Sequence, residues 1–185
     1  MKTRYIVVAL IAMLMLSGCG NSGTSSTTSS TDLTSASVNS EDEAFFRQMY
    51  ADDLCDKYNQ LLIDQEAFFE ANNNSNNAVD VQELDVDAFF AAAEKCISTL
   101  EAIIAIEPPE SLASYHEQVI EGAEYEIKFY EGVIQATKYD FGELDMSEQE
   151  KEELQAFFTE YSEAESNLFV DAYIAVLEAA AGIVQ

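Results

Sequence analysis

Apolar residues recur every three to four positions along most of this 185-residue chain, and little in the sequence interrupts that pattern. The two prolines, Pro108 and Pro109, are adjacent, and there are no runs in which apolar and polar residues alternate. Apolar spacing of 3.6 residues is typical of amphipathic helices, whereas strands show a period of two. We therefore expect an all-α fold.

Breaks in this pattern define four expected helices. Capping boxes, in which a Ser and a Glu three residues later exchange hydrogen bonds, mark the start of the first helix at Ser40–Glu43 and of the last at Ser147–Glu150. Short connections between the later helices favour an up-down-up-down antiparallel four-helix bundle. The first expected helix covers residues 41–71 and ends at the asparagine-rich run 72–77. The other three are expected at about 81–107, about 109–139 and 147–183.

The first eighteen residues do not belong to this bundle. Two basic residues precede an apolar run over residues 6–16, which is shorter than the roughly 20 residues that span a bilayer and is typical of an export signal. The sequence Leu16-Ser17-Gly18-Cys19 resembles the lipobox of bacterial lipoproteins. That resemblance implies cleavage before Cys19, a lipid on its thiol and a stable membrane anchor. The alternative is an ordinary secretory signal in which Cys19 occurs by chance.

The segment after Cys19 is expected to be a tether. Residues 20–40 are mostly Gly, Asn, Ser and Thr, the composition of a flexible coil. Residues 19–40 would then join the lipid to an acidic helical domain, residues 41–185, and they resemble the spacers of Gram-positive lipoproteins. The lipoprotein resemblance implies the extracytoplasmic face of the cell membrane. In a Gram-negative cell it implies the outer membrane, because Gly20 is not the Asp that retains lipoproteins in the inner one.

The cysteines support this compartment and set the start of the second helix. If Cys19 carries lipid, Cys55 and Cys96 form an even pair in an oxidising compartment, and we expect a disulfide; two separate buried thiols are the alternative. Asp80 and Asp87 both qualify as the N-cap of the second helix. Only a start after Asp80 puts both cysteines at similar distances from the hairpin turn, about 24 Å and 22 Å, so we expect that start.

Charge and residue types exclude several classes of function. The chain has 35 acidic and 8 basic residues, a formal net charge of −27, which excludes nucleic acid as a partner. His116 is the single histidine, so the paired Glu-x-x-His motifs of di-metal bundles are absent, and we expect His116 to be a hydrogen-bonded residue at the core edge. No cofactor and no defined metal site are expected, although weak binding of divalent cations is plausible for so acidic a surface.

The tripeptide Ala-Phe-Phe occurs four times, beginning at Ala44, Ala67, Ala88 and Ala156. In the expected topology, three of the copies meet at one end of the bundle together with Phe141. Two interpretations stay open: an aromatic core layer, or an exposed apolar groove for a partner or ligand. The candidate interaction patch consists of Phe68, Phe69, Phe89, Phe90, Phe141, Phe157 and Phe158.

Gly122 and Gly132 lie inside the expected third helix, where each costs about 1 kcal/mol relative to Ala. We expect that they allow close packing against a neighbouring helix. A kink that shapes a pocket is the alternative.

The sequence contains none of the nucleophile or phosphate-binding motifs that would indicate an enzyme. We therefore expect a lipid-anchored, non-enzymatic envelope module that binds a protein partner. The alternative is a module that holds a small apolar or cationic molecule in or between the helices. A cavity above roughly 300 Å³ would support the ligand, whereas a filled core with an exposed aromatic patch would support the partner.

Overall fold

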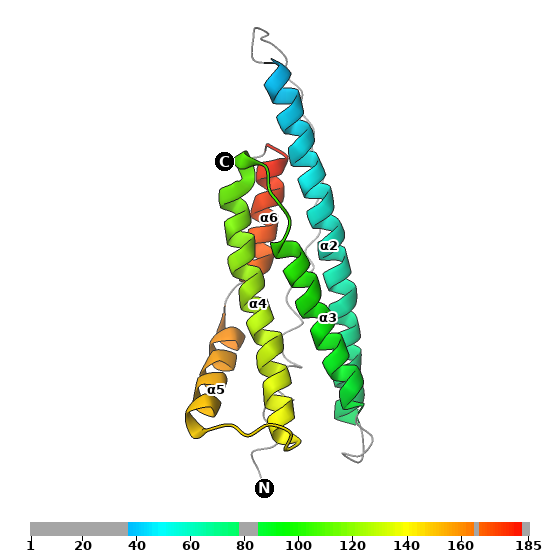
Figure 1. Ribbon diagram of the computed structural model, residues 1–185, viewed down its shortest axis with the longest axis vertical. Coiled ribbons are helices and arrows are strands. Elements are labelled where there is room, and N and C mark those ends of the chain that lie inside the picture. The colour runs from blue at the N-terminus through cyan, green and yellow to red at the C-terminus, as the bar shows by residue number, and fades with distance from the viewer. Residues whose placement is uncertain (1–36, 78–84, 165–166, 183–185) are drawn as a thin grey trace.

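The computed structural model describes residues 37–77, 85–164 and 167–182, and these residues form helices, turns and connections without any strand (Figure 1). The all-α prediction is confirmed for this part of the chain. The expected signal peptide (residues 1–18), Cys19 and the tether up to residue 36 lie outside it. No described helix is long and apolar enough to cross a membrane. The helices are α2 (Ser37–Asn77), α3 (Val86–Ile104), α4 (Ala113–Asp140), α5 (Glu148–Glu163) and α6 (Leu168–Ala180), with a 3₁₀ turn, η2 (Glu110–Leu112), before α4.

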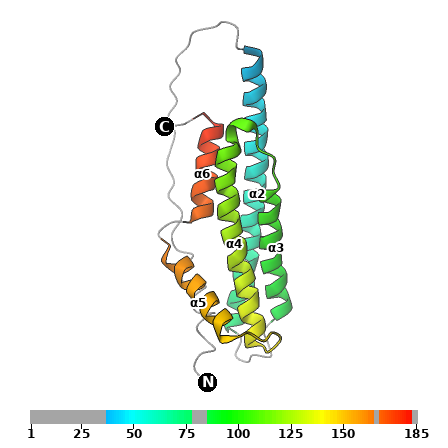
Figure 2. The same ribbon diagram turned by 60° about the vertical axis from the view of Figure 1, so that its left-hand side comes forward.

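Successive long helices run in opposite directions around a shared core. The N-terminal end of α2 projects beyond all the other helices (Figure 1). α3 reaches only part of the way up α2, and the connection from α3 climbs beside α2 to the start of α4 (Figure 1). α6 packs along the upper part of α4, whereas α5 leans away from its lower part (Figure 2).

Buried residues follow the helical period that the sequence predicts. On α2, Tyr50, Leu54, Leu61 and Phe68 are at most 4% exposed, and they pack against buried residues of α3, α4 and α6. Every buried side-chain nitrogen and oxygen of the described residues has a hydrogen-bond partner. The buried polar side chains of the described core are therefore satisfied.

Both predicted boundaries of the first helix are wrong. α2 begins at Ser37 and runs through the asparagine-rich stretch to Asn77. Ser40 is inside α2 and is therefore not its N-cap, and the carboxylate of Glu43 accepts a hydrogen bond from Arg47 at 3.0 Å. Asn72 is helical and only 4% exposed. Asparagine costs a helix no more than about 0.7 kcal/mol per residue, so burial outweighs this propensity.

The predicted start of the second helix is also wrong. The side chain of Asp85 accepts a hydrogen bond from the backbone N–H of Ala88 at 3.0 Å, so α3 begins at Val86. The N-cap of α3 is thus Asp85 and not Asp87, and Asp80 lies outside the described residues. The late start shortens α3, so Cys96 is closer to the first residue of the helix than the prediction assumed.

That shift explains why the predicted disulfide is absent: Cys55 and Cys96 are both free thiols. The hydroxyl of Thr99 donates to Asp64 at 2.7 Å, which fixes the register of α3 on α2. Cys96 is three residues before Thr99 and is therefore level with residue 67 of α2, three after Asp64. Cys55 lies twelve residues away from that level (67 − 55), about 18 Å along the helix, whereas a disulfide needs Cα atoms about 4.4–6.8 Å apart.

The two thiols instead occupy separate environments. Cys96 is fully buried, and burial raises its pKa to about 11. Cys55 is half-buried, and its sulfur accepts a hydrogen bond from the hydroxyl of Tyr173 on α6 at 3.3 Å. The structure thus follows the alternative of two separate thiols.

The expected fourth helix is broken in two. Its predicted capping box is confirmed, because Ser147 and Glu150 exchange hydrogen bonds at the start of α5. α5 nevertheless ends at Glu163, and Asn167 caps a new helix by accepting a hydrogen bond from the N–H of Val170 at 3.0 Å. Neither Pro nor Gly marks this break, and the one local signal is Asn167, a favourable N-cap residue inside the apolar pattern.

The expectation that Gly122 and Gly132 allow close packing is confirmed. A Cβ added at Gly122 would lie 2.5 Å from the Cα atom of Phe169, so the backbones of α4 and α6 are in direct contact there. A Cβ at Gly132 would lie 2.9 Å from a methyl group of Leu154 on α5. Both glycines hold a neighbouring helix against α4.

Candidate functional site

A groove of about 990 Å³ lies between the projecting part of α2 and the connection that climbs from α3 to α4. Tyr50 forms its floor and is 4% exposed, whereas Phe46 and Met49 beside it remain 56% and 53% exposed. The groove is lined by Asp42, Glu43, Phe46, Met49, Tyr50 and Asp53 from α2 and by residues 106–111 from the connection.

The short third helix creates this groove. α3 ends at Ile104, and Pro108–Pro109 prevent the helix from continuing because each proline lacks a backbone N–H. Pro109 is extended, with φ −62° and ψ 153°, so the connection passes α2 at this point as a non-helical segment. The N-terminal turns of α2 therefore have no helix beside them on this side.

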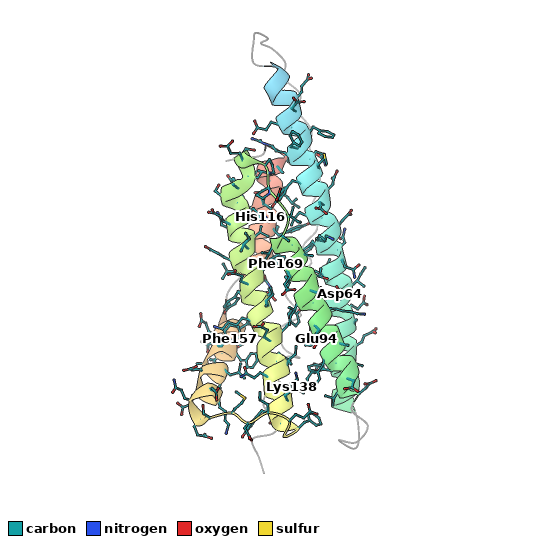
Figure 3. All side chains as sticks on the ribbon, in the orientation of Figure 1. Asp64, Glu94, His116, Lys138, Phe157 and Phe169 are labelled. Carbon is teal, nitrogen blue, oxygen red and sulfur yellow. The ribbon has the colours of Figure 1, made fainter. Side chains whose placement is uncertain are left out.

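A hydrogen-bonded pair below the groove holds its floor in place. His116, at the top of α4 (Figure 3), is 3% exposed, and its Nδ1 lies 2.7 Å from the hydroxyl of Tyr50. Its Nε2 lies 3.4 Å from the carbonyl oxygen of Ile104, which can only accept. Nε2 therefore carries the proton, and Nδ1 accepts from Tyr50. The prediction of a hydrogen-bonded core histidine is confirmed.

Both members of this pair are held in their neutral forms. Burial lowers the pKa of His116, and burial also raises the pKa of Tyr50. The pair links α2, the end of α3 and the start of α4 without introducing a charge. The hydrogen bond to His116 fixes the position of Tyr50, so the floor of the groove is rigid and uncharged.

The rim of the groove is acidic. Glu43 is bonded to Ser111 and Arg47, and these contacts lower the pKa of its carboxyl group. The guanidinium of Arg47 also donates to the hydroxyl of Ser111 at 2.9 Å, so it ties the connection to α2. The rim contains four more carboxylates, which make no salt bridge with any residue that the structure describes: Asp42, Asp53, Glu107 and Glu110.

The phenylalanines of the predicted interaction patch lie at the other end of the molecule and belong mostly to the core. Three are buried (Phe68, Phe89 and Phe157), three are half-buried against the core (Phe69, Phe90 and Phe158), and Phe141 is 39% exposed. The ring of Phe68 packs on Tyr130 at 5.2 Å, and Lys138 and Lys128 cover the rings of Phe90 and Phe157. This arrangement favours the aromatic core layer over the exposed groove.

The exposed aromatic pair is the copy that the predicted patch omitted. Phe45 and Phe46 are 60% and 56% exposed on the projecting end of α2. The length of the second helix is the sequence feature that could have predicted this exposure. A second helix that starts after Asp80 would cover this end of the first helix, whereas one that starts near Asp87 would leave it exposed. The cysteine pairing led to the longer helix and so concealed the groove.

A second polar cluster lies where α5 gives way to α6. The carboxylate of Glu126 is 4% exposed and accepts hydrogen bonds from Tyr161 at 2.9 Å and from Asn167 at 3.0 Å. Burial raises its pKa, and the two hydrogen bonds only partly oppose that effect. Glu126 therefore joins α4 to both sides of the helix break.

Glu126 predicts a specific dependence of stability on pH. Because its pKa is higher in the fold than its ordinary value of 4.5, its contribution to stability is complete below about pH 4.5 and is lost as the pH rises through the raised value. The variant Glu126→Gln cannot ionise. We expect the free energy of unfolding of the wild type, minus that of the variant, to fall as the pH rises from 4.5. Urea denaturation over a pH series measures it, and a pH-independent difference would contradict the assignment.

Within the described ranges, no group of three or more His, Cys, Asp and Glu side chains is placed to hold a metal ion. Comparisons with protein-family models, with curated proteins and with solved structures found no match to this chain. The groove is thus characterised by its own residues: a rigid apolar floor, exposed apolar walls and a negatively charged rim.

Proposed function

We propose that this protein is a lipid-anchored, exported helical module without enzymatic activity, and that it binds a protein partner of the cell envelope in the groove beside α2. This proposal rests on one observation: Phe46 and Met49 are exposed, and both line a groove of about 990 Å³. Exposed apolar side chains that gather in one place are typical of interaction sites.

The anchor would place this groove near the membrane. Cys19, the lipid attachment site that the lipobox resemblance implies, is eighteen positions before Ser37, where α2 begins. Eighteen residues reach at most about 65 Å when fully extended. The groove is at this end of α2, so we infer that the partner is itself at the membrane surface. In this proposal, α5 and α6 together form the interrupted fourth helix of an up-down-up-down bundle.

The groove suits binding better than acid–base or nucleophilic chemistry. The hydroxyl of Ser111 is engaged with Arg47 and Glu43, and the hydroxyl of Tyr50 is engaged with His116, which is neutral and hydrogen-bonded on both nitrogens. These contacts support a site that recognises a surface.

A small cationic or apolar molecule is the second candidate. A volume of about 990 Å³ is at the upper end of the roughly 300–1,000 Å³ typical of ligand pockets. Such pockets usually bury most of the ligand, whereas the walls of this groove are open enough to leave Phe46 and Met49 more than half exposed. An open groove favours the protein partner.

Site-specific photocrosslinking in intact cells tests the proposal. A photoreactive side chain at Met49, inside the groove, is compared with one at Ile63, which is 60% exposed on the same helix but outside it. We expect a discrete adduct with one envelope protein from position 49 only, and its loss when Phe46→Ser is added. No adduct at position 49, or the same adducts at both positions, would contradict a partner in the groove.

A further inference from the structure

The proposed groove has a charge distribution that restricts its occupant. Around its apolar floor, Arg47 neutralises Glu43, and four other carboxylates have no salt bridge to any described residue. Carboxylates around one groove give it a negative potential, and that potential attracts a positively charged occupant. The groove is therefore complementary to an occupant that is both apolar and positively charged.

A second copy of this chain does not fit that requirement. The net charge of −27 means that two copies would bring acidic surfaces together. An anionic lipid surface would be repelled by the rim for the same reason. The occupant must be a different molecule that supplies Lys or Arg.

The length of the groove corresponds to about three turns of a helix. Its α2 wall extends over twelve residues, from Asp42 to Asp53, and these two ends are about 16 Å apart along the helix axis, or about three helical turns. The opposite wall, residues 106–111, is a thin connection and leaves the groove open along its length. An amphipathic helix could place its apolar stripe on Phe46 and Met49 while basic side chains on its flanks reach the rim, as in other helix-in-groove complexes.

Arg47 shows how such basic side chains would be held. Its guanidinium lies between a carboxylate oxygen of Glu43 at 3.0 Å and the hydroxyl of Ser111 at 2.9 Å, one from each wall. Arginine from a partner would meet the same chemistry at the four remaining carboxylates. Building on the proposed function, we infer that the groove binds a basic amphipathic helix of the partner protein.

Calorimetry with a defined peptide tests this inference. The probe is a synthetic helix of about 18 Leu and Lys residues at amphipathic spacing, and the same peptide with Glu in place of Lys is its control. The protein is the chain from residue 19 onward with Cys19→Ser, which needs no detergent that would compete for the peptide. We expect saturable binding of the Lys peptide and none of the Glu peptide.

Two matched variants separate the groove from the general acidity of the protein. One neutralises the four unpaired rim carboxylates and leaves the Glu43–Arg47–Ser111 contacts intact: Asp42→Asn, Asp53→Asn, Glu107→Gln and Glu110→Gln. The other neutralises four exposed carboxylates elsewhere: Glu121→Gln, Glu124→Gln, Glu152→Gln and Glu163→Gln. The rim variant should bind the Lys peptide at least about 10-fold more weakly than the control variant, because surface ion pairs contribute up to about 1 kcal/mol each.

Apolar contact is tested separately with Met49→Ser and with Ile63→Ser as its matched control. Binding should weaken in the first variant and stay unchanged in the second. Equal losses in the rim and control variants, or no effect of Met49→Ser, would overturn the inference in favour of diffuse electrostatic attraction. Saturable binding of benzyltrimethylammonium without binding of the peptide would overturn it in favour of a small cation.

These outcomes are distinct from those of the crosslinking experiment. A groove-specific adduct in cells combined with no peptide binding would leave the proposed function standing and reject the basic helix. Peptide binding that depends on the rim, combined with no adduct in cells, would support the chemistry of the groove and reject a resident envelope partner.

Discussion

Replacing Gly122 with Ala is expected to lower the free energy of unfolding by up to about 2 kcal/mol, although Ala is the better helix former. The new methyl group would lie 2.5 Å from the Cα and 2.8 Å from the backbone nitrogen of Phe169. These are backbone atoms at the start of α6, so the whole helix must move away from α4. Overpacking of this kind costs about 1–3 kcal/mol, and the gain in helix propensity returns about 1 kcal/mol.

Gly132→Ala is the matched control, because this glycine is also buried in the interior of α4. Its added methyl group would meet the ends of two side chains, Leu154 at 2.9 Å and Phe158 at 3.2 Å, which can rotate aside. We expect a change within about 0.5 kcal/mol, because the gain in helix propensity offsets a small rearrangement. Urea denaturation followed by helical circular dichroism compares the two variants. Equal stability of the two would show that α6 yields to the methyl group.

The helical period predicted what the core contains, because burial of one face is a local property of each helix. Leu54, Leu61 and Phe68 recur at the predicted spacing and are fully buried. The capping box at Ser147–Glu150 was predictable for the same reason, since its bonds join residues three apart. The close packing at Gly122 was predictable in kind, although its partner, Phe169, lies beyond a helix break that the sequence marks only weakly.

The register between helices was not predictable, and the candidate site depends on it. The bond from Thr99 to Asp64 sets how far α3 reaches along α2, and these residues are 35 positions apart. The predicted disulfide between Cys55 and Cys96 instead gave an incorrect register of the second helix on the first. It lengthened the second helix over the part of α2 where Phe46 and Met49 are in fact exposed. The prediction from the repeated Ala-Phe-Phe tripeptide selected phenylalanines that belong mostly to the core, whereas the exposed pair, Phe45 and Phe46, is at the other end of the molecule.

The identical tripeptides give the sharpest contrast in stability. Phe68→Ala is expected to lower the free energy of unfolding by about 3–5 kcal/mol, the range for truncating a buried Phe. Phe68 is fully buried, and its ring contacts Phe89 on α3 and Tyr130 on α4, both with centroids 5.2 Å away. Its removal would leave a cavity where three helices meet, and it would also loosen the ring of Tyr130, whose hydroxyl accepts a hydrogen bond from Gln65.

Phe45→Ala makes the same change in the same local sequence, Ala-Phe-Phe, on the same helix. Phe45 is 60% exposed, and its one ring contact with a described residue is with its neighbour Phe46, so we expect a change within about 0.5 kcal/mol. Urea denaturation at one pH measures both variants. A loss above about 1 kcal/mol for Phe45→Ala would exceed the range for exposed positions and show that the projecting end of α2 is packed. A small loss for Phe68→Ala would show that the aromatic layer does not hold α2, α3 and α4 together. The expected contrast would show that the fold does not need Phe45, whose neighbour Phe46 lines the groove.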